Sequence, residues 1–145
     1  MKLKKFIKST CTLAVMLLIV GMYISPSVAK ASYDNPYGFA FDYDEDVDFT
    51  EEKDKYTYSS VGMECTNSES EYAYYVARVF GVDDNEESFD YSHGYEYTFY
   101  EGTSYEMLNW VRENGCNHAC VRGIGYSVDG EYGTVFSGYW NPDIY

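Results

Sequence analysis

The chain has 145 residues, with 24 acidic and 10 basic side chains. All 24 acids lie beyond residue 31, and only five bases do, so the part after residue 31 has a net charge of −19. This charge repels phosphate groups, which excludes nucleic acid and spontaneous binding to anionic lipid. It favours solubility, cations or a basic partner. The 18 tyrosines indicate a folded chain, since disordered chains are poor in aromatic residues.

The first 31 residues have the order of a secretory signal peptide. Four lysines precede residue 9, an apolar run covers 11–24, and small residues follow Pro26. We expect cleavage after Ala31, with Ala29 as the alternative. The apolar run is about 14 residues long, too short to span a bilayer comfortably, and no second run follows. The mature protein is therefore expected outside the cell, as in Gram-positive secretion, without stable membrane insertion.

Alternating aromatic residues predict β-strands in the mature chain. Every second residue of 37–43 is aromatic, and the same period of two recurs in 95–99. Residues 56–63 are a further strand candidate. Residues 72–80 are apolar on both faces, and their aromatics and valines favour a strand over a buried helix turn. The acidic stretch 42–54 is expected to be a solvated loop.

A change of period after residue 102 predicts one helix. Thr103 and Glu106 have the spacing of a capping box, in which each side chain satisfies a free backbone donor. Apolar residues follow at helical spacing, and Gly115 is a natural end. We therefore expect a short helix over residues 104–114.

The last part of the chain predicts a hairpin. Asp129-Gly130, between 121–128 and 131–140, supplies the positive φ angles of a two-residue turn. Short connections and alternating faces favour antiparallel pairing. The expected fold is mainly β, an antiparallel β-sandwich with one short helix, in a single domain over residues 32–145.

Three cysteines remain after cleavage, namely Cys65, Cys116 and Cys120, and extracellular thiols tend to oxidise. We expect one disulfide, from Cys65 to Cys116 or to Cys120, which would close a loop of about fifty residues and stabilise by ~2–4 kcal/mol. The third cysteine is left over.

Two metal sites are alternative hypotheses. On an extended chain Cys116, His118 and Cys120 point to one side, and with Cys65 they would make a tetrahedral zinc set. Secretion and the unusual spacing weigh against it. Four carboxylates suggest calcium instead: Asp42, Asp44, Asp46 and Asp48. That stretch lacks the glycine and the glutamate that an EF-hand loop requires, so only an irregular, weak site remains. No cofactor is implied.

Three short stretches together resemble a known family. They are DNPYGFAF at residues 34–41, YTYSS at 56–60 and VFSGYW at 135–140. In this order they resemble the DUF2712 family of small secreted Gram-positive proteins, a domain of unknown function. The resemblance implies export, and it supplies no catalytic residue because none is established for the family. The general plan is similar to that of the lactococcin 972 bacteriocins, with a signal peptide, a small β-rich body and an aromatic C-terminus.

These observations predict a non-enzymatic secreted protein that acts by contact with a cell-surface or basic partner, in the manner of a bacteriocin. The sequence has more tyrosine than a small core requires, and surplus rings form amphipathic contact faces. Our candidates for that face are Tyr95, Tyr97, Tyr139 and Trp140. The alternatives are an extracellular hydrolase, using a carboxylate pair or the Cys–His set, and a carbohydrate- or calcium-binding module.

Overall fold

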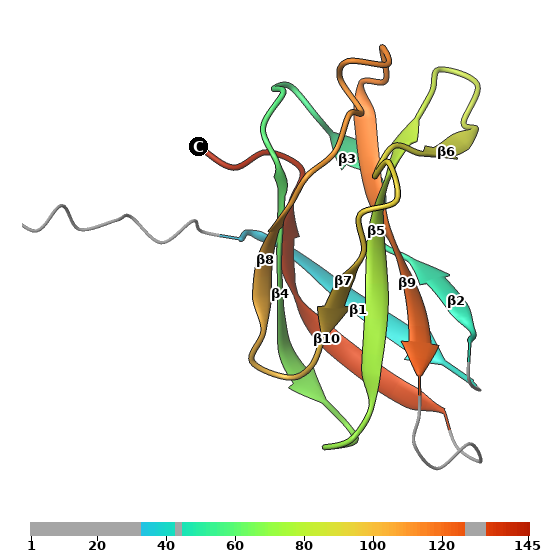
Figure 1. Ribbon diagram of the computed structural model, residues 1–145, viewed down its shortest axis with the longest axis vertical. Coiled ribbons are helices and arrows are strands. Elements are labelled where there is room, and N and C mark those ends of the chain that lie inside the picture. Colours follow the sequence, from blue (N-terminus) through green and yellow to red (C-terminus); the bar gives the residue numbers. More distant parts are fainter. Residues whose placement is uncertain (1–32, 43–44, 127–132) are drawn as a thin grey trace, which may run out of the picture. The chain divides into compact units, whose positions relative to one another are not determined.

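The structure, a computed structural model, describes residues 33–42, 45–126 and 133–145 (Figure 1). These residues belong to one compact unit of the chain, Ala31–Tyr145. They form ten β-strands and no helix, in two antiparallel sheets. The predicted signal peptide, Asp44 and the Asp129-Gly130 turn lie outside the described residues. Within the described part of the chain, no helix is long and apolar enough to cross a membrane.

The first sheet has four strands in the order β1-β10-β4-β8. β1 (Asn35–Phe41) and β10 (Thr134–Asn141) pair along their whole length, from Asn35 with Trp140 to Phe41 with Thr134. β4 (Val61–Ser68) pairs with β10 on one side and with β8 (Ser104–Met107) on the other. The beginning and the end of the domain are therefore neighbours in space.

The second sheet is built on β5 (Tyr74–Val82) and β9 (His118–Tyr126), which pair over nine residues. β2 (Val47–Phe49) and β3 (Lys53–Asp54) pair with the other edge of β9. β6 (Ser88–Asp90) and β7 (Tyr97–Phe99) pair with β5. The chain passes repeatedly from one sheet to the other, and the two sheets pack as an antiparallel β-sandwich, as predicted.

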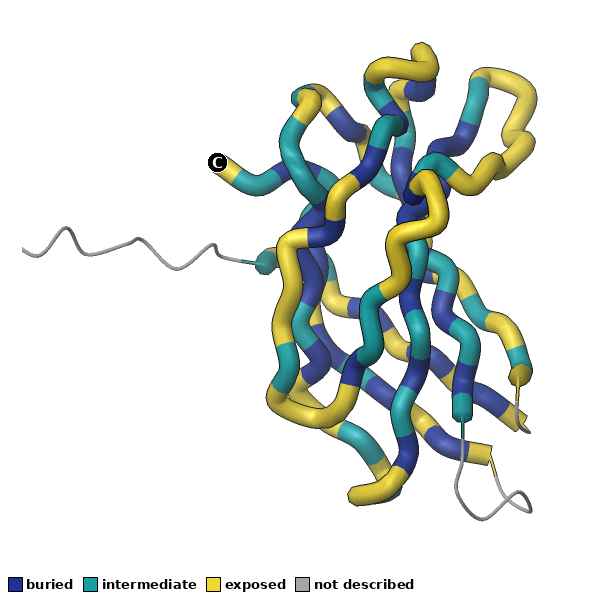
Figure 2. The backbone as a smooth tube through the Cα atoms, viewed as in Figure 1, coloured by how far each residue is buried: buried dark blue, intermediate teal, exposed yellow. Residues whose placement is uncertain are grey.

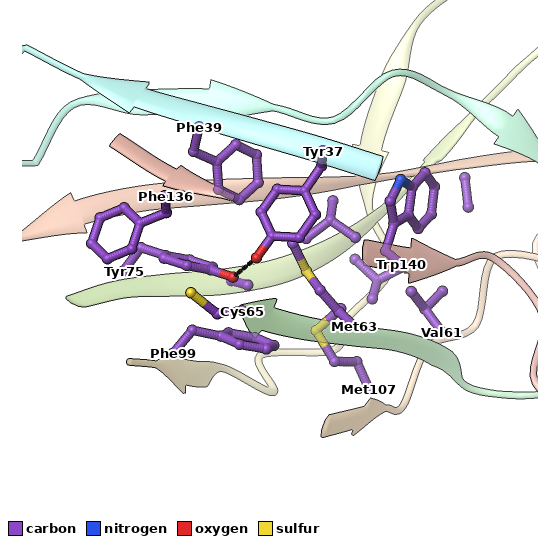
Figure 3. Packing of buried hydrophobic residues seen from close by; sticks show 14 of the residues in the cluster. Tyr37, Phe39, Val61, Met63, Cys65, Tyr75, Phe99, Met107, Phe136 and Trp140 are labelled. Carbon is purple, nitrogen blue, oxygen red and sulfur yellow. Dashed lines mark hydrogen bonds between the residues drawn. The ribbon is translucent and has the colours of Figure 1, made fainter. Parts of the chain in front are cut away.

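The core lies between the sheets and is mostly aromatic (Figure 3). Phe39, Tyr75 and Phe136 are fully buried and their rings make tilted or edge-on contacts. The Tyr75 ring stacks on Phe99 with centroids 4.9 Å apart. Each such side chain stabilises the fold by about 1.5–3 kcal/mol when it leaves water. The alternation of the sequence thus appears as alternating buried and exposed positions along β1 and β10 (Figure 2).

Small residues allow this close packing. A Cβ on Gly125 of β9 would overlap the Phe41 ring, so only glycine lets β1 lie this close to β9. Gly138 of β10 lies against the carbonyl oxygen of Glu64, next to a register shift between Ser137 and Gly138. Such a bulge re-aims the strand and increases its twist.

The helix predicted over 104–114 is wrong. Ser104–Met107 is strand β8, paired with Val61–Glu64 of β4, and the following residues form turns. Thr103 does not cap a helix, because its Oγ1 donates to the Tyr100 carbonyl and accepts from the Tyr100 amide. A helix of eleven residues is marginal without tertiary support, and pairing with the buried β4 outweighs it.

The observed strand pairing also corrects the predictions for residues 42–54, for residues 56–63 and for the C-terminal hairpin. The strand expected over 56–63 begins at Val61, and the acidic loop of 42–54 contains β2 and β3. Strands β9 and β10, expected to form a hairpin, lie in different sheets. Packing of the two sheets against each other, and not closeness in the sequence, therefore sets which strands pair.

Candidate functional site

Three aromatic side chains stack at the surface of the sandwich. The rings of His93 and Trp110 lie parallel, with centroids 4.2 Å apart and planes 2° apart. The Tyr95 ring is 6.0 Å from Trp110 and inclined by 20°. His93 and Tyr95 are exposed and Trp110 is half-buried. We call these three residues the aromatic stack.

Two connections position the aromatic stack. His93 and Tyr95 lie between β6 and β7, and Trp110 lies between β8 and β9 (Figure 1). The Trp110 amide donates to the Tyr91 carbonyl at 3.0 Å, which joins the connections directly. The amide and side-chain nitrogens of Asn114 both donate to the Trp110 carbonyl. The indole is thus held by hydrogen bonds on both sides of its backbone.

The turn that carries His93 contains two consecutive residues with positive φ angles. The buried Ser92 donates from its amide and its Oγ to Asp90 Oδ1, at 2.9 and 2.5 Å. His93 follows with φ 51°, a left-handed conformation that residues with a Cβ rarely adopt. Gly94, at φ 84°, continues the turn without that cost. Glu45 and Glu86 have similar φ angles in other loops, so this conformation positions the His93 ring without by itself marking a site.

The predicted contact residues have four different environments. Tyr95 is 49% exposed and belongs to the aromatic stack. Tyr139 is 43% exposed on the outer side of β10. Tyr97 is half-buried on the core side of β7, where its hydroxyl accepts from the Leu108 amide at 2.9 Å. Trp140 is fully buried in the core, so its assignment to a contact face is wrong.

A second group of aromatic rings lies on the outer face of the β5–β9 sheet. Tyr74 and Tyr126 occupy paired positions and stack with centroids 5.1 Å apart. Tyr100 lies 5.4 Å from Tyr74 on the other side. These three tyrosines lie on regular strands or directly beside one, with no strained turn behind them.

The predicted disulfide is absent from the structure. Cys65, Cys116 and Cys120 are all free and buried. Cys65 lies in the core beside Tyr37 and Tyr75, whose hydroxyls are 2.5 Å apart (Figure 3). Burial raises the pKa of the Cys65 thiol. A thiol in this environment behaves as a small apolar side chain.

The other two thiols face opposite sides of the β5–β9 sheet. Cys116 belongs to the central core and packs against Gly81, whereas Cys120 packs with Phe80 in a separate cluster. Burial raises the pKa of Cys120 to about 11, so the thiol stays protonated and is a poor nucleophile. Opposite faces prevent this pair from forming a bridge.

The zinc hypothesis does not fit this arrangement. Cys120 lies in a different cluster from Cys65 and Cys116, and His118 Nε2 lies 3.0 Å from Asp54 Oδ1 instead. Among the described residues, no group of three or more His, Cys, Asp or Glu side chains could hold a metal ion.

The aspartates proposed for calcium accept backbone hydrogen bonds. Asp48 Oδ2 accepts from the Ala40 amide at 3.0 Å, and Asp46 Oδ2 accepts from the Asp42 amide at 2.9 Å. Both amides lie on or directly after β1, at the edge of its sheet. The carboxylates therefore cover donors of an edge strand that could otherwise pair with another chain.

A buried ion pair fixes the C-terminus. Lys55 Nζ donates to the carbonyls of Ser59 (2.8 Å) and Pro142 (2.6 Å) and to Asp143 Oδ1 (3.2 Å). Asp143 also accepts from the Tyr56 and Thr57 amides at 2.7 and 3.0 Å. We call this network the C-terminal clasp; its members are Lys55, Tyr56, Thr57, Ser59, Pro142 and Asp143.

The charges of Lys55 and Asp143 in the C-terminal clasp are compensated by each other and by hydrogen bonds. Burial lowers the pKa of Lys55, and the nearby Asp143 charge opposes that effect. Burial acts to raise the pKa of Asp143, but hydrogen bonds from Thr57 and Tyr56 outweigh it and lower that pKa. Lys55 Nζ has three oxygen acceptors within hydrogen-bond distance, one for each ammonium proton, so we interpret the network as structural.

A family model described as protein of unknown function (DUF2712) matches residues 25–144. The chain belongs to the DUF2712 family. No curated protein and no solved structure matches the chain. In this DUF2712 protein, the three stretches that carry the resemblance lie in β1, in the C-terminal clasp and in β10, all parts of the structural frame.

The aromatic stack was only partly visible in the sequence. Tyr95 is one of the predicted contact residues, but Trp110 lies within the range of the predicted helix and no sequence pattern points to His93. The Ser-His-Gly turn and the tryptophan are 17 residues apart, and no local period connects them. Their juxtaposition depends on β6, β7 and β8 pairing as they do.

Proposed function

We propose that this DUF2712 protein is exported, loses residues 1–31, and acts outside the cell without catalysis, by contact through the aromatic stack. Its effect on a neighbouring cell is of the bacteriocin type. The observation that carries the proposal is the stack itself. A strained turn and a second, hydrogen-bonded connection hold three parallel rings at the surface.

Rigid display of rings suits recognition. An aromatic ring gives a large contact area at low conformational cost, and a preorganised surface loses little entropy on binding. The rings of the stack already make their contacts in the free protein, so a partner meets a formed surface. The sandwich core has no need of His93 or Tyr95, because both are exposed.

The hydrolase alternative has weak support from the thiols and the histidine. A nucleophilic cysteine needs a lowered pKa or an adjacent base. Cys120 has a raised pKa, and His118 lies beside Asp54. Cys116 is buried in the core, away from any substrate.

Export and activity can be tested on the same preparation. The full-length chain is expressed in a Gram-positive host, and the intact mass of the exported protein locates the cleavage site. That protein is then mixed with sensitive Gram-positive cells, and cell-bound protein and growth are measured. We expect binding and growth inhibition, both reduced by Trp110→Ala and unchanged by Tyr58→Ala, which removes an exposed ring elsewhere.

Two outcomes contradict the proposal. One is an exported protein that still contains residues 2–24. The other is turnover of peptide or glycan substrates that is lost in Cys116→Ala or His118→Ala, together with no inhibition of any sensitive strain.

A further inference from the structure

The described basic side chains are engaged within the fold. Lys55 belongs to the C-terminal clasp, and Arg78 forms ion pairs with Asp90 at 3.0 Å and with Glu96. Lys53 contacts Glu51 at 3.0 Å. Arg112 donates to the Cys116 carbonyl, and the guanidinium of Arg122 lies 5.0 Å from the Phe80 ring centroid. These are all five bases beyond residue 31, so the surface presents mainly unmatched carboxylates to a partner.

The aromatic stack lies within this acidic surface. Glu113 is exposed in the turn after Trp110, whereas Glu96, which follows Tyr95, is paired with Arg78. The face of an indole carries negative charge density and attracts a cation more strongly than other rings do. Parallel rings beside carboxylates therefore offer a cationic group both short-range and long-range attraction. The Arg122–Phe80 contact shows the same kind of interaction inside the fold.

We propose that the aromatic stack is the docking site for arginine or lysine side chains of a basic polypeptide. This inference rests on the contact function proposed above and names the chemistry of its partner. The partner's cationic side chains lie against the rings of Trp110 and Tyr95, and the net charge of −19 steers the partner toward the domain. Steering of this type raises association rates and weakens as salt screens the charges.

The probe is a synthetic hexa-arginine peptide, titrated into the exported protein at low and at moderate salt. Affinity is measured by calorimetry, and the Trp110 environment is followed by tryptophan fluorescence. A hexaglutamate peptide and a neutral chito-oligosaccharide are the comparison ligands. Variants are Trp110→Ala, Trp110→Phe and Tyr95→Ala, with Tyr58→Ala as the matched control because Tyr58 is 69% exposed on another loop. Thermal unfolding of each variant shows that the fold is kept.

We expect binding of hexa-arginine only, and weaker binding at higher salt. Trp110→Ala should lower the affinity by about 5- to 30-fold, and Tyr95→Ala by less. Trp110→Phe should keep part of the affinity, because a smaller ring still attracts a cation. Tyr58→Ala should bind like the wild type.

Three results would overturn the inference. The first is salt-sensitive binding that is unchanged by Trp110→Ala, which would reflect net charge alone. The second is equal weakening by Tyr58→Ala. The third is Trp110-dependent binding of cells or of the chito-oligosaccharide that hexa-arginine does not compete away. That last result would leave the contact function standing and replace a basic partner by a glycan. Loss of all binding, to cells and peptide alike, removes both proposals.

Discussion

The two tryptophans of the chain lie in regions of opposite character. Trp140 is fully buried between the sheets, on the strand that joins β1 to β4. Trp110 is half-buried on a connection, and its ring stacks with those of an exposed histidine and an exposed tyrosine. Both residues come from aromatic-rich stretches. The difference teaches that an aromatic residue of this protein serves the frame when its strand directs it between the sheets, and is available for contact when it lies on a connection or on an outer face.

The residues that carry the family resemblance are different from those of the candidate site. The stretches at 34–41, 56–60 and 135–140 build β1, the C-terminal clasp and β10. The aromatic stack contains none of them. Motifs of this kind secure the fold, and the proposed contact residues lie between them, on connections.

Replacement of each tryptophan by alanine is the most direct test of this comparison. Trp140→Ala should reduce the free energy of unfolding by about 3–5 kcal/mol, because it leaves a large cavity in the core. Trp110→Ala should reduce it by about 1 kcal/mol or less, since a half-buried side chain on a connection loses little packing. Urea unfolding, followed by far-UV circular dichroism, measures both. Equal losses would show that Trp110 is also a core residue.

Substitution of Asp143 measures how much the C-terminal clasp contributes to the stability of the fold. Asp143→Ala leaves the Lys55 ammonium buried without its charge partner, and the expected loss is about 3–5 kcal/mol. Lys53→Ala is the matched control, because it removes an exposed ion pair and should change stability by about 1 kcal/mol at most. Denaturant midpoints give both values. A loss in Asp143→Ala no greater than in the control would mean that the clasp is not closed in solution.

The same carboxylate predicts a pH dependence. Because the pKa of Asp143 is lowered in the folded state, its charge stabilises the fold above the ordinary carboxyl pKa. That stability is lost as the pH falls through the lowered folded value. The lowered pKa of Lys55 acts in the basic range, where the fold gains stability as the pH rises toward the ordinary lysine value. The stability difference between wild type and Asp143→Asn should therefore shrink between about pH 5 and pH 2. A constant difference over this range would contradict the assignment.

Removal of the edge-covering carboxylates should have a smaller effect. Asp48→Ala frees the Ala40 amide at the edge of β1 and should cost about 0.5–1.5 kcal/mol, the net value of one such hydrogen bond. Addition of calcium should leave the melting temperature of the wild type unchanged. A calcium-dependent rise that disappears in Asp48→Ala would restore the calcium hypothesis.

The thiols give the smallest expected signal, a difference in reaction rate. Cys65 and Cys120 have raised pKa values, and all three cysteines among the described residues are buried. Native protein should therefore react very slowly with a thiol reagent, and unfolded protein should react at three sites. Mass spectrometry before and after reduction counts these sites. A single free thiol in the unfolded, unreduced protein would restore the disulfide prediction.

The sequence by itself determined the family, the fold class and the inward face of β1. Tyr37, Phe39 and Phe41 alternate, and a period of two with one aromatic face can be satisfied only by a strand packed on a core. The strand over 72–80 was visible for another reason, because it is apolar on both faces and its β-branched and aromatic residues fit a buried sheet. These signals are local, so the residues of each segment are enough to predict that the segment is a strand.

Tertiary structure alone decided the remaining features. Residues 104–107 have a helix-like pattern but become a strand because β4 offers a buried partner. Lys55 and Asp143 are 88 residues apart, and the rings of the aromatic stack come from two connections, so no local pattern contains either arrangement. Trp140 resembles a surface aromatic in sequence and is buried because it lies on the face of β10 that packs into the core between the sheets. Strand partners are chosen by the total burial of both sheets, and that free energy belongs to the whole domain.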